Sequence, residues 1–180
     1  RAAEMPPEVR PFEAALEGRL TLTDHLRACG YAVVGGGKIH HHDRKGQRFW
    51  DDYWERAELK PEDKPTAGFN GLGRDHFDWG ALDGVREEQM PDYKLVSWAI
   101  DRLGAPPADK PLFLAVGIVK PHLPWYVPRK YFDLYPPADQ IPLAEVKSGD
   151  RDDIPALALN SYKGDNLTDE QRRLLRRAYW

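Results

Sequence analysis

The sequence has one cysteine, no long apolar run and little excess of charge of either sign. Cys29 alone excludes an internal disulfide framework and a cysteine-rich zinc site. No apolar stretch approaches the roughly 18 residues of a membrane helix. The net charge of −3 gives no electrostatic reason to expect nucleic acid or an anionic membrane surface as a partner. The opening residues RAAEMPPEVR lack the apolar core of a signal peptide.

Two units in which a helix precedes a strand define the expected fold class. The stretch TLTDHLRACG predicts a short helix that Thr21 caps and Gly30 ends, and residues 31–34 then form a buried strand that breaks at three glycines. A second helix is expected from Asp92 to Gly104, before the continuous apolar strand 112–119, which suits a strand covered on both faces. We therefore expect an α/β fold with a mostly parallel sheet flanked by helices.

Other segments have weaker patterns. Residues 43–91 are polar with little periodicity, which predicts a long surface excursion with short helical turns. Ten of the 16 prolines lie between Pro106 and Pro155, so the stretch after the second strand is expected to be extended loop. Thr168 and Gln171 form a capping-box pattern before an amphipathic helix that reaches the end of the sequence.

Both predicted strands end in lysine and histidine. Lys38 is followed by three adjacent histidines, and Lys120 and His122 follow the second strand. Ligands of open α/β sheets bind at the carboxyl ends of strands, so these two exits indicate one basic pocket for an anion. Pro121 and Pro124 bracket His122, which restricts the backbone and favours one orientation of the imidazole.

Each motif also has a structural reading. The glycines of GGGKIHHHD are consistent with a flexible turn, and no nucleotide-binding P-loop pattern is present. His40, His41 and His42 are equally consistent with solvated side chains, and at most two would face one pocket in an extended chain. WYVPRKYFDLYPP suits either a peptide- or sugar-binding face or aromatic anchors packed on the core. FDWGALD suits a carbohydrate site or, more simply, a packed loop.

Three segments together resemble the middle of a type I sulfatase of the iduronate-2-sulfatase-like branch, in the alkaline phosphatase superfamily. They are GYAVVGGGKIHHH, FDWGALDGVREEQMPDYKLVSWAIDRL and KPLFLAVGIVKPHLPWYVPRKYFDLYP, in the family's order. The resemblance implies an alkaline-phosphatase-like layered fold. It also implies that residues 1–180 are an internal portion of a catalytic domain whose N- and C-terminal parts lie elsewhere.

The resemblance assigns roles to five residues. Lys38 would bind a sulfate oxygen, His41 would hydrogen-bond the nucleophile, and His122 would protonate the leaving alcohol. These three are the expected catalytic residues, and Lys120 and His40 are expected to contact the substrate. Related sulfatases place the histidine two positions after the lysine rather than three, so the choice between His40 and His41 stays open.

Sulfatases use a formylglycine made from the Cys or Ser of a C/S-x-P/A-x-R motif, which this sequence lacks. Their divalent ion, usually Ca²⁺, is expected to be bound outside this chain, since the acidic pairs Asp51-Asp52 and Asp152-Asp153 do not follow apolar strands and are read as surface charge. The chain alone is therefore expected to be inactive. The resemblance implies a sulfated carbohydrate substrate, a periplasmic or secreted location, and neither nucleic acid nor membrane as a partner.

Three other functions remain open from the sequence. A phosphodiesterase or phosphonate hydrolase of the same superfamily shares the fold and the divalent-ion chemistry. A non-catalytic module that binds anions or glycans would need only the basic strand ends and the aromatic loop. A metal-binding protein would use the three histidines. One geometric prediction follows from the sulfatase reading: side-chain nitrogens of Lys38, His41 and His122 lie within about 8 Å of one another, and His42 points away.

Overall fold

The computed structural model describes residues 16, 18–40, 49–65, 68–70, 77–145, 147–159 and 167–180. The chain divides into two compact units, one formed by Arg1–Ala57 and Lys94–Ile118, the other by Glu58–Tyr93 and Val119–Trp180. All strand pairings in both units are parallel within the described ranges. This is an α/β architecture with parallel sheets flanked by helices, as the sequence predicts, and it is consistent with the alkaline-phosphatase-like fold that the resemblance implies.

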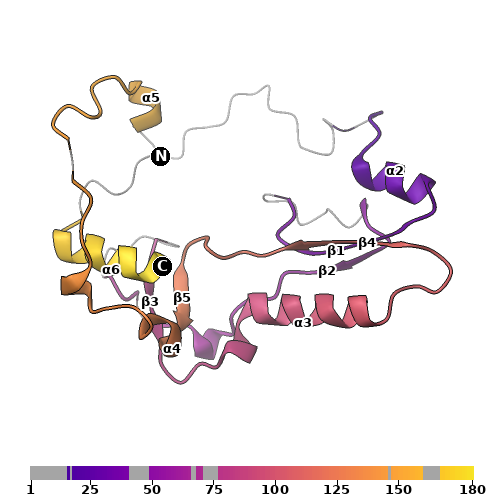
Figure 1. Cartoon of the computed structure of the whole chain (residues 1–180), viewed down its shortest axis with the longest axis horizontal. Helices are drawn as coiled ribbons and strands as arrows, with labels where there is room; N and C mark the ends of the chain where they lie inside the picture. The colour runs from indigo at the N-terminus through magenta and orange to yellow at the C-terminus, as the bar shows by residue number, and fades with distance from the viewer. Residues whose placement is uncertain are drawn as a thin grey trace. The chain divides into compact units, whose positions relative to one another are not determined.

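The first unit contains a three-stranded sheet (Figure 1). Its strands are β1 (Ala32–Gly37), β2 (Asp52–Trp54) and β4 (Leu112–Gly117), in the order β2-β1-β4. Helix α2 (Leu22–Ala28) precedes β1, and most of α3 (Pro91–Gly104) belongs to this unit. Strand β1 is central and is buried along its whole length.

Helix α2 begins and ends where the sequence predicts. The Thr21 hydroxyl accepts a hydrogen bond from the Asp24 backbone N–H at 3.2 Å, and the Asp24 carboxylate accepts one from the Thr21 N–H. This reciprocal pair is a capping box. Gly30 has a φ of +86°, the left-handed conformation that ends a helix with little steric cost.

The three glycines of β1 continue the strand instead of breaking it, so the predicted end at residue 34 is wrong. Added to Gly35, a Cβ would lie 2.6 Å from the Trp50 ring, and added to Gly36 it would lie 2.6 Å from the Trp98 ring. Successive residues of a strand face opposite sides of the sheet. Two tryptophan rings therefore cover the two faces of β1, and glycine is required because the rings occupy the side-chain space.

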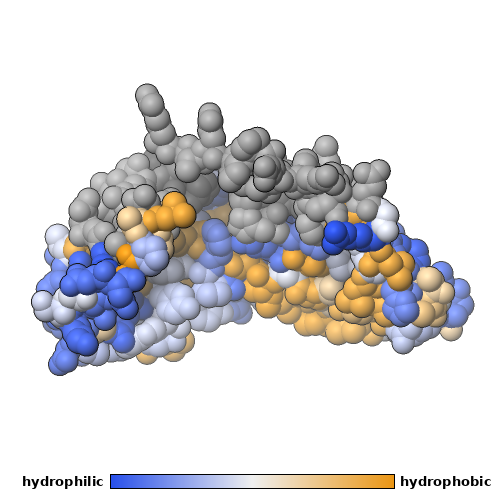
Figure 2. Space-filling view, turned by 90° about the horizontal axis from the view of Figure 1, so that it is seen from above, coloured by the Kyte–Doolittle hydropathy of each residue, from blue (hydrophilic) through white to orange (hydrophobic). Residues whose placement is uncertain are grey.

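Strand β4 differs from the expected strand covered on both faces. Its residues are half-buried, and Val116 is 38% exposed, because β4 is an edge strand of this described sheet. Helix α3 buries Leu95 and Ala99, while Ile100 and Leu103 are both more than 60% exposed. Hydrophobic residues consequently form a broad surface over this unit (Figure 2).

The second unit contains a two-stranded parallel sheet that the sequence did not predict. It pairs β3 (Trp79–Leu82) with β5 (Trp125–Pro128). Both strands fall in stretches expected to be loop, and β3 is fully buried. Its other described elements are the 3₁₀ turns Pro61–Asp63, Glu87–Gln89 and Ala138–Gln140 and the helices α4 (Arg129–Phe132), α5 (Ala156–Leu159) and α6 (Asp169–Tyr179).

Helix α6 begins at the predicted capping box, with the Thr168 hydroxyl accepting from the Gln171 N–H at 3.2 Å. It packs beside β3 and β5. The guanidinium of Arg177 on this helix donates to the carbonyl oxygen of Phe132, the last residue of α4, at 2.8 Å. In the described ranges, no helix combines the length and the apolar character needed to cross a membrane.

Candidate functional site

The backbone of Lys38 is fixed where β1 ends. Its N–H donates to the carbonyl oxygen of Gly117, the last residue of β4, at 2.7 Å. Gly37 has a φ of +79°, and a Cβ on Gly117 would lie 2.2 Å from the Lys38 carbonyl carbon. Only glycine at these two positions permits the strand ends to approach this closely. The half-buried Lys38 side chain therefore leaves the carboxyl end of the sheet from a defined point.

His40 lies against the hydrophobic core of the first unit. Its ring centroid is 5.8 Å from that of Phe49, which is buried in a cluster with Val33 and Trp50. His41 and His42 lie outside the described residues. The expected roles of His40 and His41, and the choice between them, stay predictions.

The Lys-Pro-His-x-Pro loop of the second unit holds the exposed His122 by two backbone carbonyls. The His122 N–H donates to the Val119 oxygen at 2.9 Å, and the ring Nδ1 lies 2.6 Å from the Leu123 oxygen. Because a carbonyl oxygen only accepts, Nδ1 must carry the proton in this contact. Nε2 is then the nitrogen that exchanges a proton with a ligand, which is the arrangement a general acid or base needs. Peptide bonds preceding both prolines of the loop are cis.

The carboxylate of Asp92 anchors the start of this loop. Its two oxygens accept hydrogen bonds from the backbone N–H groups of Val119 and Lys120, at 3.0 and 2.9 Å. The second helix was expected to begin at Asp92, but α3 begins at Pro91, and Asp92 lies within its first turn and binds the strand exit. Sequence reasoning missed this role because 27 positions separate the two segments.

The end of the loop is anchored on β3. The backbone N–H of Trp125 donates to the carbonyl oxygen of Asp78 at 2.9 Å, and its indole N–H donates to the Pro121 oxygen at 2.5 Å. The Lys120 ammonium donates to the carbonyl oxygen of Pro124. The loop is thus held at both ends and across its middle. Hydrogen bonds to the backbone of the loop therefore set the position of His122.

Asp78 is the buried polar centre of the second unit. Its carboxylate accepts hydrogen bonds from the backbone N–H groups of Phe69 and Asn70, at 2.8 and 3.0 Å, and from the Tyr126 hydroxyl at 2.6 Å. Burial, followed by the hydrogen bond to Asp78, raises the pKa of the Tyr126 phenol far above its usual range. FDWGALD is therefore a packed structural segment, as its simpler reading predicts, although it forms a strand rather than a loop.

The two acidic pairs have different surroundings. Asp51 was read as surface charge, but its carboxylate accepts the Val33 N–H of β1 and a guanidinium N–H of Arg27, both at 2.8 Å. These two contacts lower the pKa of the Asp51 carboxyl, with the Val33 hydrogen bond the larger cause. Asp152 and Asp153 are exposed, as expected.

No group of three or more His, Cys, Asp or Glu side chains in the described part of the chain is arranged to hold a metal ion. The sulfatase resemblance places the ligands of the divalent ion outside this chain, and no step below is derived through a metal.

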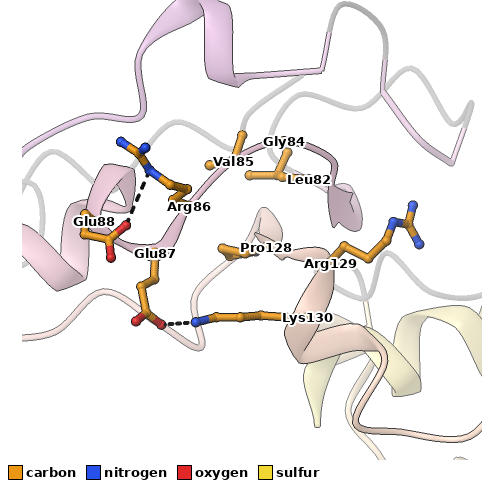
Figure 3. A pocket seen from close by; sticks show the side chains of 9 residues that line it. All are labelled: Leu82, Gly84, Val85, Arg86, Glu87, Glu88, Pro128, Arg129 and Lys130. Atoms are coloured by element: carbon orange, nitrogen blue, oxygen red, sulfur yellow. Dashed lines mark hydrogen bonds and ion pairs between the residues drawn. The ribbon is translucent and has the colours of Figure 1, made fainter.

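A cavity of about 360 Å³ lies where β3 and β5 end (Figure 3). Carboxyl ends of parallel strands favour ligand sites, but each basic side chain here faces a carboxylate. Lys130 pairs with Glu87 at 2.5 Å and Arg86 with Glu88 at 3.7 Å, and Arg129 binds Asp83 through two N–H groups. The cavity consequently offers little uncompensated positive charge to an anion.

Comparison with known proteins agrees with the resemblance. No family model matches the chain. The chain is 31% identical to a protein of Formosa agariphila named Sulfatase, over 169 aligned positions that cover 83% of this chain. It spans only 31% of that relative's length. The similarity supports membership of the sulfatase family.

The structure places the predicted residues in separate units. Lys38 and His40 belong to the first unit, and Lys120 and His122 belong to the second. Their convergence on one sulfate group stays a prediction.

Proposed function

We propose that the protein containing this chain is a sulfuric ester hydrolase of the iduronate-2-sulfatase-like branch that removes O-sulfate from a sulfated sugar. The observation that carries this proposal is the Lys-Pro-His-x-Pro loop, in which backbone contacts fix the His122 ring and direct its proton exchange to Nε2. The likeness to a sulfatase over 83% of the chain supports it independently.

His122 serves as the general acid in this proposal. As the S–O bond to the sugar breaks, the bridging oxygen takes both bonding electrons and becomes basic. The imidazolium gives its Nε2 proton to that oxygen, while Nδ1 keeps its hydrogen bond to the Leu123 carbonyl. General acid catalysis of this kind contributes typically ~10²–10⁴-fold in rate.

Lys38 binds the sulfate group itself. Its ammonium neutralises non-bridging sulfate oxygens, and His41 hydrogen-bonds the nucleophile. Loss of one preorganised donor of this type costs about 3–4 kcal/mol of transition-state stabilisation. The tight contact between Lys38 and Gly117 supports this role, because a donor on a fixed backbone reorganises little during the reaction.

The proposal includes a formylglycine nucleophile and a divalent ion, expected to be Ca²⁺, contributed by parts of the protein beyond these residues. When bound, the ion would supply positive charge near the sulfate oxygens. We also propose a periplasmic or secreted location, where sulfated polysaccharides are accessible.

The test measures hydrolysis by the full-length protein of 4-nitrophenyl sulfate, bis(4-nitrophenyl) phosphate and a 4-nitrophenyl phosphonate ester. We expect the sulfate ester to be the best substrate by kcat/KM, and the 180-residue chain alone to release no nitrophenol. Preference for the phosphate diester or the phosphonate would favour the related hydrolases. Binding of sulfated glycans without any turnover would favour a non-catalytic module.

A further inference from the structure

A second cavity of about 300 Å³ lies next to the loop that carries His122. It is formed within the second unit by the loop, β5, α4 and α6. Half of its lining residues are aromatic and two are cationic, and the residues that matter below are Lys120, Trp125, Tyr131, Leu134, Arg177 and Tyr179. The proposed function leaves this cavity without a role.

Aromatic rings at the cavity are both exposed and held in place. Tyr131 and Tyr179 are 39% and 55% exposed. Trp125 lies 5.1 Å from Tyr179 in an edge-to-face arrangement, and its indole N–H is occupied by the Pro121 carbonyl, so its ring is fixed. Apolar side chains that are exposed together around a cavity are typical of a binding site, whereas single exposed apolar side chains are common on any protein surface.

The guanidinium of Arg177 in this cavity is anchored by neutral groups. Arg177 donates to the carbonyl oxygens of Phe132 and Tyr135, at 2.8 and 3.2 Å, and its Nε is buried without a hydrogen-bond partner among the described residues. The Lys120 ammonium donates to the Pro124 carbonyl. Carbonyl oxygens position a cation without neutralising its charge. Arg177 thus differs from Arg129 and Lys130 of the cavity beyond β3 and β5, each of which faces a carboxylate.

We infer that this cavity binds one sugar ring carrying an anionic substituent, a carboxylate or a sulfate, of the same substrate whose sulfate ester meets His122. The inference rests on the proposed function and identifies where the sugar is recognised. Aromatic faces contact the apolar C–H face of a sugar ring, and the Arg177 guanidinium attracts its negative charge. The volume is at the lower end of the roughly 300–1,000 Å³ typical of small-molecule sites, which suits a single ring.

The experiment uses the full-length protein and the variant Arg177→Met, which keeps an apolar stem over Phe132 and removes the charge. The measurements are kcat/KM for a panel of sulfated disaccharides and for 4-nitrophenyl sulfate, with calorimetric binding of the disaccharides. We expect Arg177→Met to lower the ratio of the disaccharide value to the aryl sulfate value roughly tenfold, as loss of a charge-assisted hydrogen bond implies. Arg86→Met, in the other cavity, is the control and should leave both values unchanged.

A second pair of variants keeps the test decisive if Arg177→Met lowers stability. Leu134 is 73% exposed at the rim, so a charged residue there is compatible with folding. Leu134→Asp should weaken binding of the anionic disaccharides, and Leu134→Lys should maintain or strengthen it.

Three results would overturn the inference: an equal loss on both kinds of substrate, a lowered melting temperature with an unchanged substrate ratio, or no difference between the Leu134 variants. A lowered melting temperature with an unchanged substrate ratio would indicate that another part of the protein covers the cavity. A wild-type protein that binds the disaccharides but hydrolyses no sulfate ester would contradict the proposed function and leave the sugar site supported.

Discussion

The Asp92 carboxylate holds the backbone of Lys120, accepting its N–H at 2.9 Å through one oxygen while the other accepts the N–H of Val119 at 3.0 Å. A carboxylate that receives two consecutive N–H groups fixes the direction in which the chain continues. His122 follows two residues later, so Asp92 acts on the proposed general acid through the backbone. Asp92 is a positioning residue in this account.

Replacing Asp92 with Ala should lower the activity of the full-length protein most for sulfate esters with poor leaving groups. Replacing His122 with Ala should have the same dependence on the leaving group but a larger effect. We expect a loss of roughly ten- to hundredfold on sulfate esters with poor leaving groups, since a misplacement of about 1 Å has effects of this size. The measurement is kcat for a series of aryl sulfates whose phenols differ in pKa. Asp101→Ala, an exposed position of α3, is the control. A loss independent of the leaving group would mean that Asp92 only stabilises the fold.

Replacing His122 with Ala should reduce kcat for alkyl or sugar sulfates by ~10²–10⁴-fold, and much less for 4-nitrophenyl sulfate. The reason is that nitrophenolate leaves readily without a proton, whereas a sugar alkoxide does not. The slope of log kcat against leaving-group pKa measures the difference. The same loss on both substrates would assign His122 to binding or structure.

Local signals in the sequence predicted α2, α3 and α6, but not the four-residue helices α4, which lies in the stretch expected to be extended loop, and α5. Thr21 and Thr168 begin helices by hydrogen bonds to residues three positions later, and Gly30 ends one by its own backbone conformation. These interactions lie within a few residues, so the sequence pattern contains them completely.

Strands that depend on distant contacts were not predicted. Trp79–Leu82 and Trp125–Pro128 are four residues long and contain Gly80 and Pro128, which favoured loop. Their pairing is stabilised by Asp78, which collects hydrogen bonds from segments up to 48 positions away. The glycines of β1 were misread for the same reason, because Trp98 fills the side-chain space of Gly36 from more than 60 positions along the chain.

The sequence predicted part of the candidate site. Motif spacing pointed to Lys38 and His122, and the structure places Lys38 directly after a parallel strand and His122 in a loop held by the backbone. The support from Asp92 and the aromatic cavity could not be predicted, because both depend on contacts between segments far apart in the sequence.

Replacing Asp51 with Asn should lower the free energy of unfolding of the full-length protein by about 1 kcal/mol at pH 7, a modest value because the contact is partly exposed. The pKa of Asp51 is lower in the folded state, so its contribution is fully present above the unfolded pKa of about 3.9 and is lost as the pH falls. Urea denaturation from pH 7 to pH 3 should show the difference from wild type shrinking below about pH 4. A difference that stays constant with pH would contradict this, and Asp101→Asn is the matched control.

Replacing Asp78 with Ala should destabilise the protein by about 3 kcal/mol or more, since three hydrogen-bond donors lose their acceptor in a buried place. Tyr126→Phe removes only one of these bonds and should cost about 1–2 kcal/mol. Urea denaturation of both variants gives the comparison. Equal effects of the two substitutions would show that the backbone N–H groups of Phe69 and Asn70 do not depend on Asp78.

The central claim is that Lys38 and His122 serve one sulfate group, and the most direct test is a crystal structure of the full-length protein with a sulfated sugar or its sulfate product bound. The measurement is the distance from the sulfate to the Lys38 Nζ and to the His122 Nε2. We predict that both atoms lie within hydrogen-bond reach of the same group and within about 8 Å of each other. His122 on the opposite side of the sheet from Lys38 would contradict the account.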